Sequence, residues 1–134
     1  MYENQARKAA PGTGGLLLQQ KWEDLALYLH NNVLAHMGKR HLFTLGERLD
    51  ALLWDVQADI VRLTYNSGNR LPQLLTLDAQ KEILLAQLRL AVKMKIVPER
   101  RFDHISDLIL EIGRIIGGLK KRNSAMLADR GTAR

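Results

Sequence analysis

The sequence contains no cysteine, and only three of its 134 residues are proline. Without cysteine the chain cannot form disulfides, thiolate zinc sites or a thiol nucleophile, and its composition suits a reducing compartment such as the cytoplasm. Aromatic residues make up 5% of the chain and hydrophobic residues 46%, so the core must be mainly aliphatic. This aliphatic content argues against disorder.

No apolar stretch is long enough for a secretory signal or a membrane span. Three leucines at positions 16–18 are followed at once by Gln19 and Gln20, whereas a signal needs an apolar run of about 7–15 residues. The longest uncharged stretch, residues 25–38, contains two histidines and two asparagines and is too short to cross a bilayer. We therefore expect a cytoplasmic protein without a membrane partner.

Basic residues outnumber acidic ones, 20 against 14, which gives a formal net charge of +6. Residues 1–70 carry eight basic and seven acidic side chains, whereas residues 71–134 carry twelve and seven. An uneven basic balance favours a polyanionic partner, either nucleic acid or an anionic membrane surface. The alternative is a basic surface that is merely solvated.

Residues 1–15 are polar and end in Pro-Gly-Thr-Gly-Gly, which predicts a flexible N-terminal leader. The leader lacks the Gly-Lys-Ser/Thr ending of a phosphate-binding loop. Beyond it, apolar residues recur at steps of three and four up to Gly38, which predicts a first amphipathic helix. The residues of this stripe are Leu18, Trp22, Leu25, Leu29 and Val33.

Two further helices follow. Thr44 and Glu47 form a capping-box pair that predicts the start of the second helix, and Asn66-Ser67-Gly68-Asn69 predicts its end. Thr76 or Asp78 is expected to cap the third helix, which continues to about Ile96. The apolar stripes are Leu45, Leu49, Leu52, Val56, Ile60 and Leu63 in the second helix and Leu77, Leu84, Leu88, Ala91 and Val92 in the third.

The fourth helix is expected to start at Pro98 and to close with Lys120, Lys121 and Arg122. Its stripe is spaced 3-4-3-4-3 and contains Phe102, Ile105, Ile109, Ile112, Ile116 and Leu119. No alternating pattern predicts a strand. The sequence thus predicts an all-α protein, an antiparallel up-down four-helix bundle over residues 16–123, followed by a flexible C-terminal tail over residues 124–134.

The fourth helix carries a second apolar row, Leu108 and Ile115, and three interior glycines. A glycine in a helix interior costs about 1 kcal/mol, and close approach of a neighbouring backbone is the usual reason for its presence. We therefore expect Leu108, Gly113, Ile115, Gly117 and Gly118 to pack against another subunit, with an intramolecular crossing as the alternative.

Residues for catalysis or metal binding do not form a recognisable motif. The four histidines are not paired at metal-ligand spacing, and no serine lies in a nucleophile elbow. Asp103, Asp107 and Glu111 form an acidic row on the fourth helix, which is typical of a salt-bridged surface. We expect no enzyme, no metal and no cofactor, although acid–base catalysis by this row is a further hypothesis.

The basic residues are the better functional candidates, because cations at intervals along a surface suffice to bind a phosphate backbone. Residues 89–122 carry nine Lys and Arg against four Asp and Glu. Few aromatics are available to stack on bases, so binding should not depend on the base sequence. The candidate residues are Lys39, Arg40, Arg89, Lys93, Lys95, Arg100, Arg101, Arg114, Lys120, Lys121 and Arg122.

Two motifs resemble the accessory variability determinant (Avd) family of diversity-generating retroelements. One is Phe43-Thr44-Leu45-Gly46-Glu47-Arg48-Leu49, preceded by Lys39-Arg40. The other combines Leu88-Arg89-Leu90-Ala91, residues 93–96 and the stretch from Glu111 to Gly118. The resemblance covers about residues 20–122, and Leu119 departs from the tryptophan that the family often has after the double glycine.

The resemblance implies a small four-helix protein that forms a homopentamer, binds RNA and DNA, and associates with the retroelement's reverse transcriptase. With template RNA, such proteins support the mutagenic cDNA synthesis of mutagenic retrohoming, and they occur in bacteria, archaea and phages. Among the candidates, Arg89, Lys93, Lys95 and Arg114 fall in the matching motifs. The alternatives are the related four-helix proteins of ribosomal RNA intervening sequences and an oligomeric scaffold that binds an acidic protein.

Overall fold

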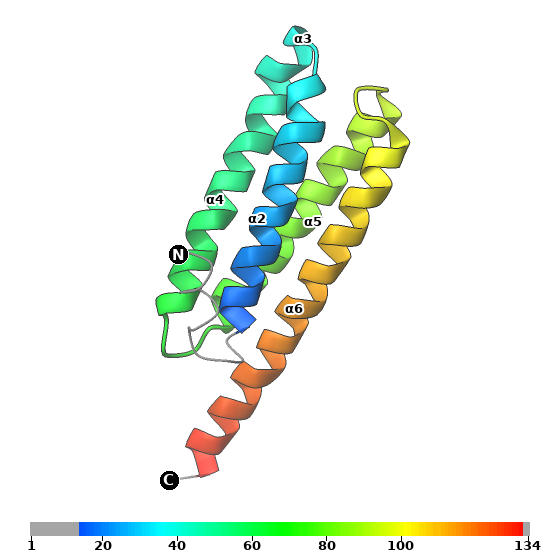
Figure 1. Cartoon of the computed structure of the whole chain (residues 1–134). Coiled ribbons are helices and arrows are strands. Elements are labelled where there is room, and N and C mark those ends of the chain that lie inside the picture. The colour runs from blue at the N-terminus through cyan, green and yellow to red at the C-terminus, as the bar shows by residue number, and fades with distance from the viewer. Residues whose placement is uncertain (1–13, 133–134) are drawn as a thin grey trace, which may run out of the picture.

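The computed structural model describes residues 14–132, which form four long helices (Figure 1). They are α2 (Gly14–Asn32), α4 (Glu47–Tyr65), α5 (Leu71–Lys93) and α6 (Glu99–Thr132). Three short elements join α2 to α4: a 3-10 turn η1 (Leu34–His36), the single turn α3 (Lys39–His41) and a π-helical turn η2 (Leu42–Gly46). No strand occurs in residues 14–132, and the predicted all-α four-helix bundle is confirmed.

The helices are packed in a square. Helix α2 contacts α4 and α6, and α5 contacts the same two helices on the opposite side. Consecutive long helices run in opposite directions, so the α2–α4 and α5–α6 connections lie at one end of the bundle and the α4–α5 loop at the other (Figure 1). This arrangement places two turns that are far apart in sequence at a common end.

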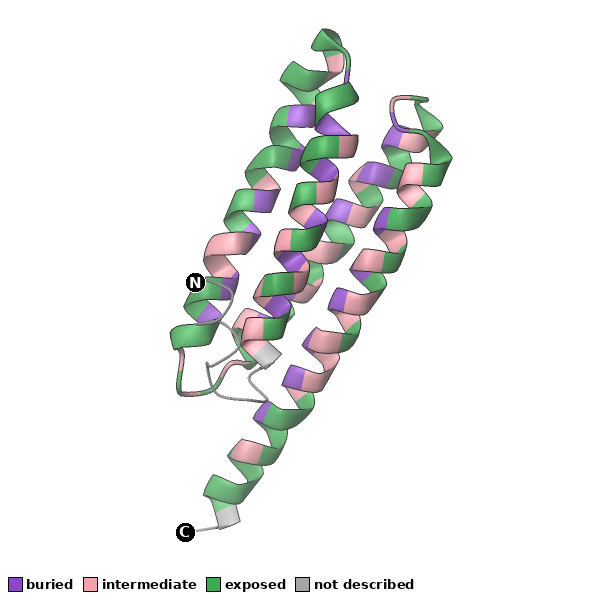
Figure 2. Ribbon diagram, viewed as in Figure 1, coloured by how far each residue is buried: buried purple, intermediate pink, exposed green. Residues whose placement is uncertain are grey.

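Apolar residues from all four helices fill the core (Figure 2). Every residue of the first predicted stripe is buried, as are the five isoleucines and leucines of the fourth, while Leu45, Leu52, Val92 and Phe102 are partly buried. The indole of Trp22 is 1% exposed, and its Nε1 donates a hydrogen bond to the Leu53 carbonyl at 3.1 Å. The periodic spacing therefore identified the buried faces correctly.

The predicted capping box at the second helix is wrong. Gly38 is extended and its carbonyl accepts hydrogen bonds from the amides of His41 and Leu42, so the chain is already helical from Lys39. The Thr44 hydroxyl turns back to the carbonyls of Arg40 and His41 instead of capping an amide. No helix begins at Thr44, because the backbone amides around it already belong to continuous helical turns.

The third helix starts earlier than predicted, at Leu71, and neither Thr76 nor Asp78 caps it. Pro72 lies in its first turn, where a missing amide N–H costs little. The amide of Leu71 donates to Asn69 Oδ1 at 3.1 Å, and that of Arg70 donates to Asn123 Oδ1 at 2.9 Å. A side chain from α6 thus supplies part of the cap.

The fourth helix begins at Glu99, after Pro98, and ends at Thr132, ten residues later than its predicted end at Arg122. Its last turns extend past the other three helices, and most of their side chains are exposed (Figure 2). The predicted boundaries of the leader and the tail stay predictions, and residues 1–13 and 133–134 lie outside the described residues. None of the helices within residues 14–132 has the length and apolar character required to cross a membrane.

Candidate nucleic-acid interface

The end of the bundle that holds the α2–α4 and α5–α6 turns gathers most of the predicted basic site. The two turns are linked directly, because the Arg101 guanidinium donates to Asn32 Oδ1 at 3.0 Å across α6 and α2. Residues 33–46 contain two Lys or Arg and no acidic residue, and residues 93–101 contain four basic residues and only Glu99 as an acid. The cationic excess at this end is therefore five charges.

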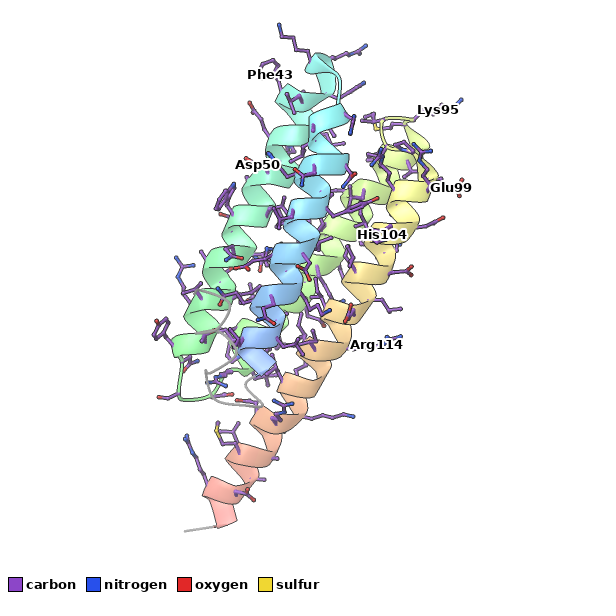
Figure 3. All side chains as sticks on the ribbon, in the orientation of Figure 1. Phe43, Asp50, Lys95, Glu99, His104 and Arg114 are labelled. Carbon is purple, nitrogen blue, oxygen red and sulfur yellow. The ribbon has the colours of Figure 1, made fainter. Side chains whose placement is uncertain are left out.

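We call five exposed residues of this end the turn-end cluster, namely Lys39, Arg40, Lys93, Lys95 and Arg100. They come from α3, α5, the α5–α6 turn and α6, and Lys95 of this turn projects into solvent (Figure 3). Within residues 14–132 none of the five takes part in an ion pair. Arg89 is also exposed and lies one helical turn before Lys93 on α5. These cations remain available to an external anion.

Lys95 has an unusual backbone conformation. Its φ is 63°, in the left-handed region that favours glycine. The amide of Lys95 donates to the Val92 carbonyl and the amide of Ile96 to the Ala91 carbonyl, both at 2.9 Å, which is the hydrogen-bond pattern of a Schellman helix end. A lysine therefore occupies the position at which glycine is most stable, and the turn holds its side chain outward.

Phe43 is a candidate that charge-based reasoning missed, although it belongs to the first family motif. It is 63% exposed at the tip of the bundle (Figure 3), in the η2 turn that directly follows the α3 turn of Lys39 and Arg40. Gly46 ends the π-helical turn that presents it, and a Cβ there would lie 3.0 Å from Leu42 Cδ1 and 3.3 Å from Met37 Sδ, so a larger residue would force these side chains to shift. An exposed aromatic ring among cations suits stacking on an unpaired base.

The remaining predicted basic residues lie elsewhere. Arg101 is half-buried and bonded to Asn32, and Arg114 projects from the middle of α6 (Figure 3). Lys120, Lys121 and Arg122 lie about 30 Å from the start of α6, given a rise of about 1.5 Å per residue. The structure therefore does not bring the eleven predicted residues together, and only part of them shares one surface.

Lys120 is engaged by an acidic residue of α5. Its Nζ lies 3.0 Å from Asp78 Oδ2, and Lys81 Nζ lies 3.1 Å from Asp78 Oδ1 and 2.7 Å from Glu82 Oε1. Burial opposes the charged form of Asp78, but hydrogen bonds from Lys120 and Lys81 outweigh it and lower the pKa of the carboxyl below 3.8. Likewise, burial disfavours the charged form of Lys81, yet Glu82 and Asp78 raise its pKa above 10.5.

The sequence model of the bAvd-like family matches residues 16–123, which is most of the chain and the whole predicted bundle. The chain belongs to the bAvd-like family. The predicted resemblance is thereby confirmed, and it makes the chain a relative of accessory, non-catalytic proteins of diversity-generating retroelements. Neither the curated proteins nor the solved structures contain a match to the chain.

The acidic row of this bAvd-like protein forms part of its surface. Glu111 pairs with Lys21 of α2 at 3.1 Å, whereas Asp103 and Asp107 are exposed. The His104 ring contacts that of Tyr28 in a tilted arrangement, with ring centroids 4.3 Å apart and an interplanar angle of 49°. Within residues 14–132 no three potential ligand side chains are grouped so that they could hold a metal ion. The row is best described as a salt-bridged and solvated helix face.

The predicted packing residues of the bAvd-like bundle separate into three groups. Leu108 and Ile115 are partly buried against the core, on the side of α6 that faces α2. Gly113 makes room for the Lys81 side chain, whose Cε would lie 3.1 Å from an added Cβ. Gly117 and Gly118 have nothing within 4 Å of an added Cβ, so contacts within residues 14–132 provide no reason for them.

Proposed function

We propose that this protein is a nucleic-acid-binding accessory subunit of a diversity-generating retroelement. In this function it associates with the retroelement's reverse transcriptase and template RNA in the cytoplasm and supports mutagenic cDNA synthesis. The turn-end cluster carries the proposal, because it collects exposed and unpaired cations from two distant parts of a bAvd-like chain. Phosphate groups are the ligands that such a surface fits best.

The composition of the surface indicates how nucleic acid would be bound. Lysine and arginine contacts to phosphates position a strand without selecting a sequence. Among residues 14–132, Phe43 is the single strongly exposed aromatic residue at the turn end, so stacking can add to binding but cannot read an extended sequence. We therefore propose affinity for RNA, and also for DNA, with little base specificity and a strong dependence on salt.

Self-association would strengthen such binding. We propose that the chain forms a homo-oligomer, most simply the pentamer implied by the family. Five copies would carry a formal charge of +30, since each carries +6. Several turn ends on one particle would bind one long RNA with an effective concentration that a single chain lacks.

The test combines RNA binding with reverse-transcriptase association. Arg89→Glu with Lys93→Glu reverses two exposed charges next to the turn, and we expect at least a tenfold loss of RNA affinity and weaker capture of the retroelement's reverse transcriptase. A matched control, Arg62→Glu with Arg130→Glu, changes the net charge by the same amount on exposed positions away from this end. Equal behaviour of the two double variants would contradict the proposal.

A protein-binding scaffold is the competing function, and the same assay separates the two. RNA bound by phosphate contacts is displaced by heparin, whereas a specific protein interface resists it. If the reverse transcriptase binds the chain and heparin or random RNA does not compete, the basic surface is not needed for the association. In that case the nucleic-acid part of the proposal is wrong.

A further inference from the structure

Two opposite faces of the bundle differ in shape and charge. One face is formed by α2 and α4, and the other by α5 and α6, because the square packing places these helix pairs on opposite sides. Together α2 and α4 carry six acidic and three basic residues, a net charge of −3. Together α5 and α6 carry seven acidic and ten basic residues, a net charge of +3.

The α2–α4 face has an apolar groove with projecting side chains. The groove has a volume of about 480 Å³, and its floor includes Trp22 and Leu53. Leu27 and Trp54 stand at its edge and are 60% and 69% exposed. The charged residues of its lining are acids, Glu23 and Asp50, with His30 nearby, and no Lys or Arg lines it. Within residues 14–132 Asp50 has no ion-pair partner.

The α5–α6 face has a second groove, and Gly113 forms part of its lining. This groove measures about 320 Å³, and its lining includes Leu110, Gly113 and Arg114 together with the ion-paired Lys81 and Glu82. Leu110 is exposed, and Gly117 lies one helical turn beyond Gly113 on the same side of α6. Arg114 is exposed, and among residues 14–132 it has no ion-pair partner.

We propose that the α2–α4 face of one copy packs into the α5–α6 groove of a second copy. Trp54 and Leu27 would pack over the open side of α6 at Gly117, which gives Gly117 the packing reason that the single chain lacks. Asp50 and Glu23 would meet the basic side of the groove, including Arg114. The inference rests on the proposed homo-oligomer and names the surfaces that build it.

Charge decides this arrangement over a two-fold dimer. Pairing two α2–α4 grooves would place Glu23 and Asp50 against the same two acids, whereas pairing unlike grooves places them against a lining with two cations, Lys81 and Arg114, and one acid, Glu82. In a dimer formed by two different faces, one copy still has a free α2–α4 face and the other a free α5–α6 face. Further copies can therefore add until a ring closes. Arg114 then belongs to the contact between copies and not to the nucleic-acid surface.

Two glycines of α6 provide the sharpest test. Gly117→Leu and Gly131→Leu both enter open space in the single chain, but Gly131 lies on the last turns of α6, past the other three helices and away from the groove. Sedimentation at micromolar concentration should give the mass of one chain for Gly117→Leu and the wild-type oligomer mass for Gly131→Leu. A wild-type mass for both variants, or a monomeric wild type, would overturn the inference.

Substitution of Trp54 tests the α2–α4 face. Trp54→Ala should raise the dissociation constant between copies about 30-fold or more, as for a tryptophan at the centre of an interface. Phe43→Ala, which removes a similarly exposed aromatic side chain at the turn end, should leave assembly unchanged. If Trp54→Ala assembles normally and instead loses the reverse transcriptase, the face binds another protein and the inference is wrong.

Charge reversal completes the test. Asp50→Arg and Arg114→Asp should each weaken assembly, and the double variant should regain part of it, because opposite charges again face each other. No recovery in the double variant would contradict the pairing of these two faces. RNA binding by the wild-type chain, measured separately, reports on the proposed function, so either proposal can fail while the other stands.

Discussion

Individual residues at the turn end have conformations that are costly for folding. Lys95 adopts a left-handed backbone at which any side chain with a Cβ is strained, and glycine commonly ends helices in this way. A strained conformation that persists at a surface turn calls for a functional explanation. Holding a cation outward between α5 and α6 is the explanation that the turn-end cluster supplies.

We expect Lys95→Gly to raise the free energy of unfolding by about 0.5–1 kcal/mol while weakening RNA binding. The gain comes from removing the strained Cβ, and the loss from removing the charge. Lys95→Ala is the matched control, since it removes the charge and keeps the Cβ. Urea unfolding and RNA titration of both variants would check this, and equal stability of the two would refute the strain.

Asp78 makes the free energy of unfolding depend on pH in the acidic range. Its folded pKa lies below the ordinary 3.8, so the unfolded chain takes up the proton first, and the stability that Asp78 adds above about pH 4 is lost as the pH falls through the folded pKa. Asp78→Asn should cost no more than about 1 kcal/mol at pH 7, because the carboxylate is partly exposed.

Acid unfolding of this variant should therefore show a shallower loss of stability below pH 4 than the wild type. Asp107→Asn removes an exposed carboxylate with no ion pair in residues 14–132 and serves as the control. If Asp78→Asn and the wild type lose stability in parallel between pH 4 and pH 2, the ion pairs of Asp78 with Lys81 and Lys120 contribute nothing to the free energy of unfolding.

At the scale of helices, burial could be predicted and helix ends could not. The spacing of Leu18, Trp22 and Leu25, or of Ile105, Ile109 and Ile112, reports directly which face is turned inward, because the helical period is fixed. Helix ends depend on partners that spacing does not show. Asn123, which bonds Arg70 at the start of α5, lies 53 residues away in the sequence.

The contact of Asn123 with the start of α5 can be tested by mutation. It is 5% exposed, its Oδ1 accepts from the Arg70 amide, and its Nδ2 donates to Asn69 Oδ1 at 3.0 Å. Asn123→Ala leaves both loop groups without these partners and should lower the free energy of unfolding by about 1–3 kcal/mol. Ser124→Ala, at the exposed neighbouring position, should change it by less than about 0.5 kcal/mol. Chemical denaturation distinguishes the two, and equal values would show that the cap is dispensable.

At the scale of the whole molecule, the sequence predicted which residues are basic but not how they are distributed. Lys39 and Arg40 lie more than 50 residues before Lys95 and Arg100 in the sequence, yet the antiparallel topology brings both pairs to the same end. Lys120 seemed equivalent to them, yet Asp78, 42 residues earlier, engages it. Charge counting cannot detect either fact, because both depend on which helices are neighbours.

The salt dependence of RNA binding tests the proposed function most directly. The logarithm of the affinity falls with the logarithm of the salt concentration, with a slope of roughly 0.7 per phosphate contact for single strands. The wild-type chain should show a steep slope, and replacing Lys39, Arg40, Lys95 and Arg100 by Gln should reduce it by up to about 3. An unchanged slope in the fourfold variant would contradict phosphate binding at the turn end.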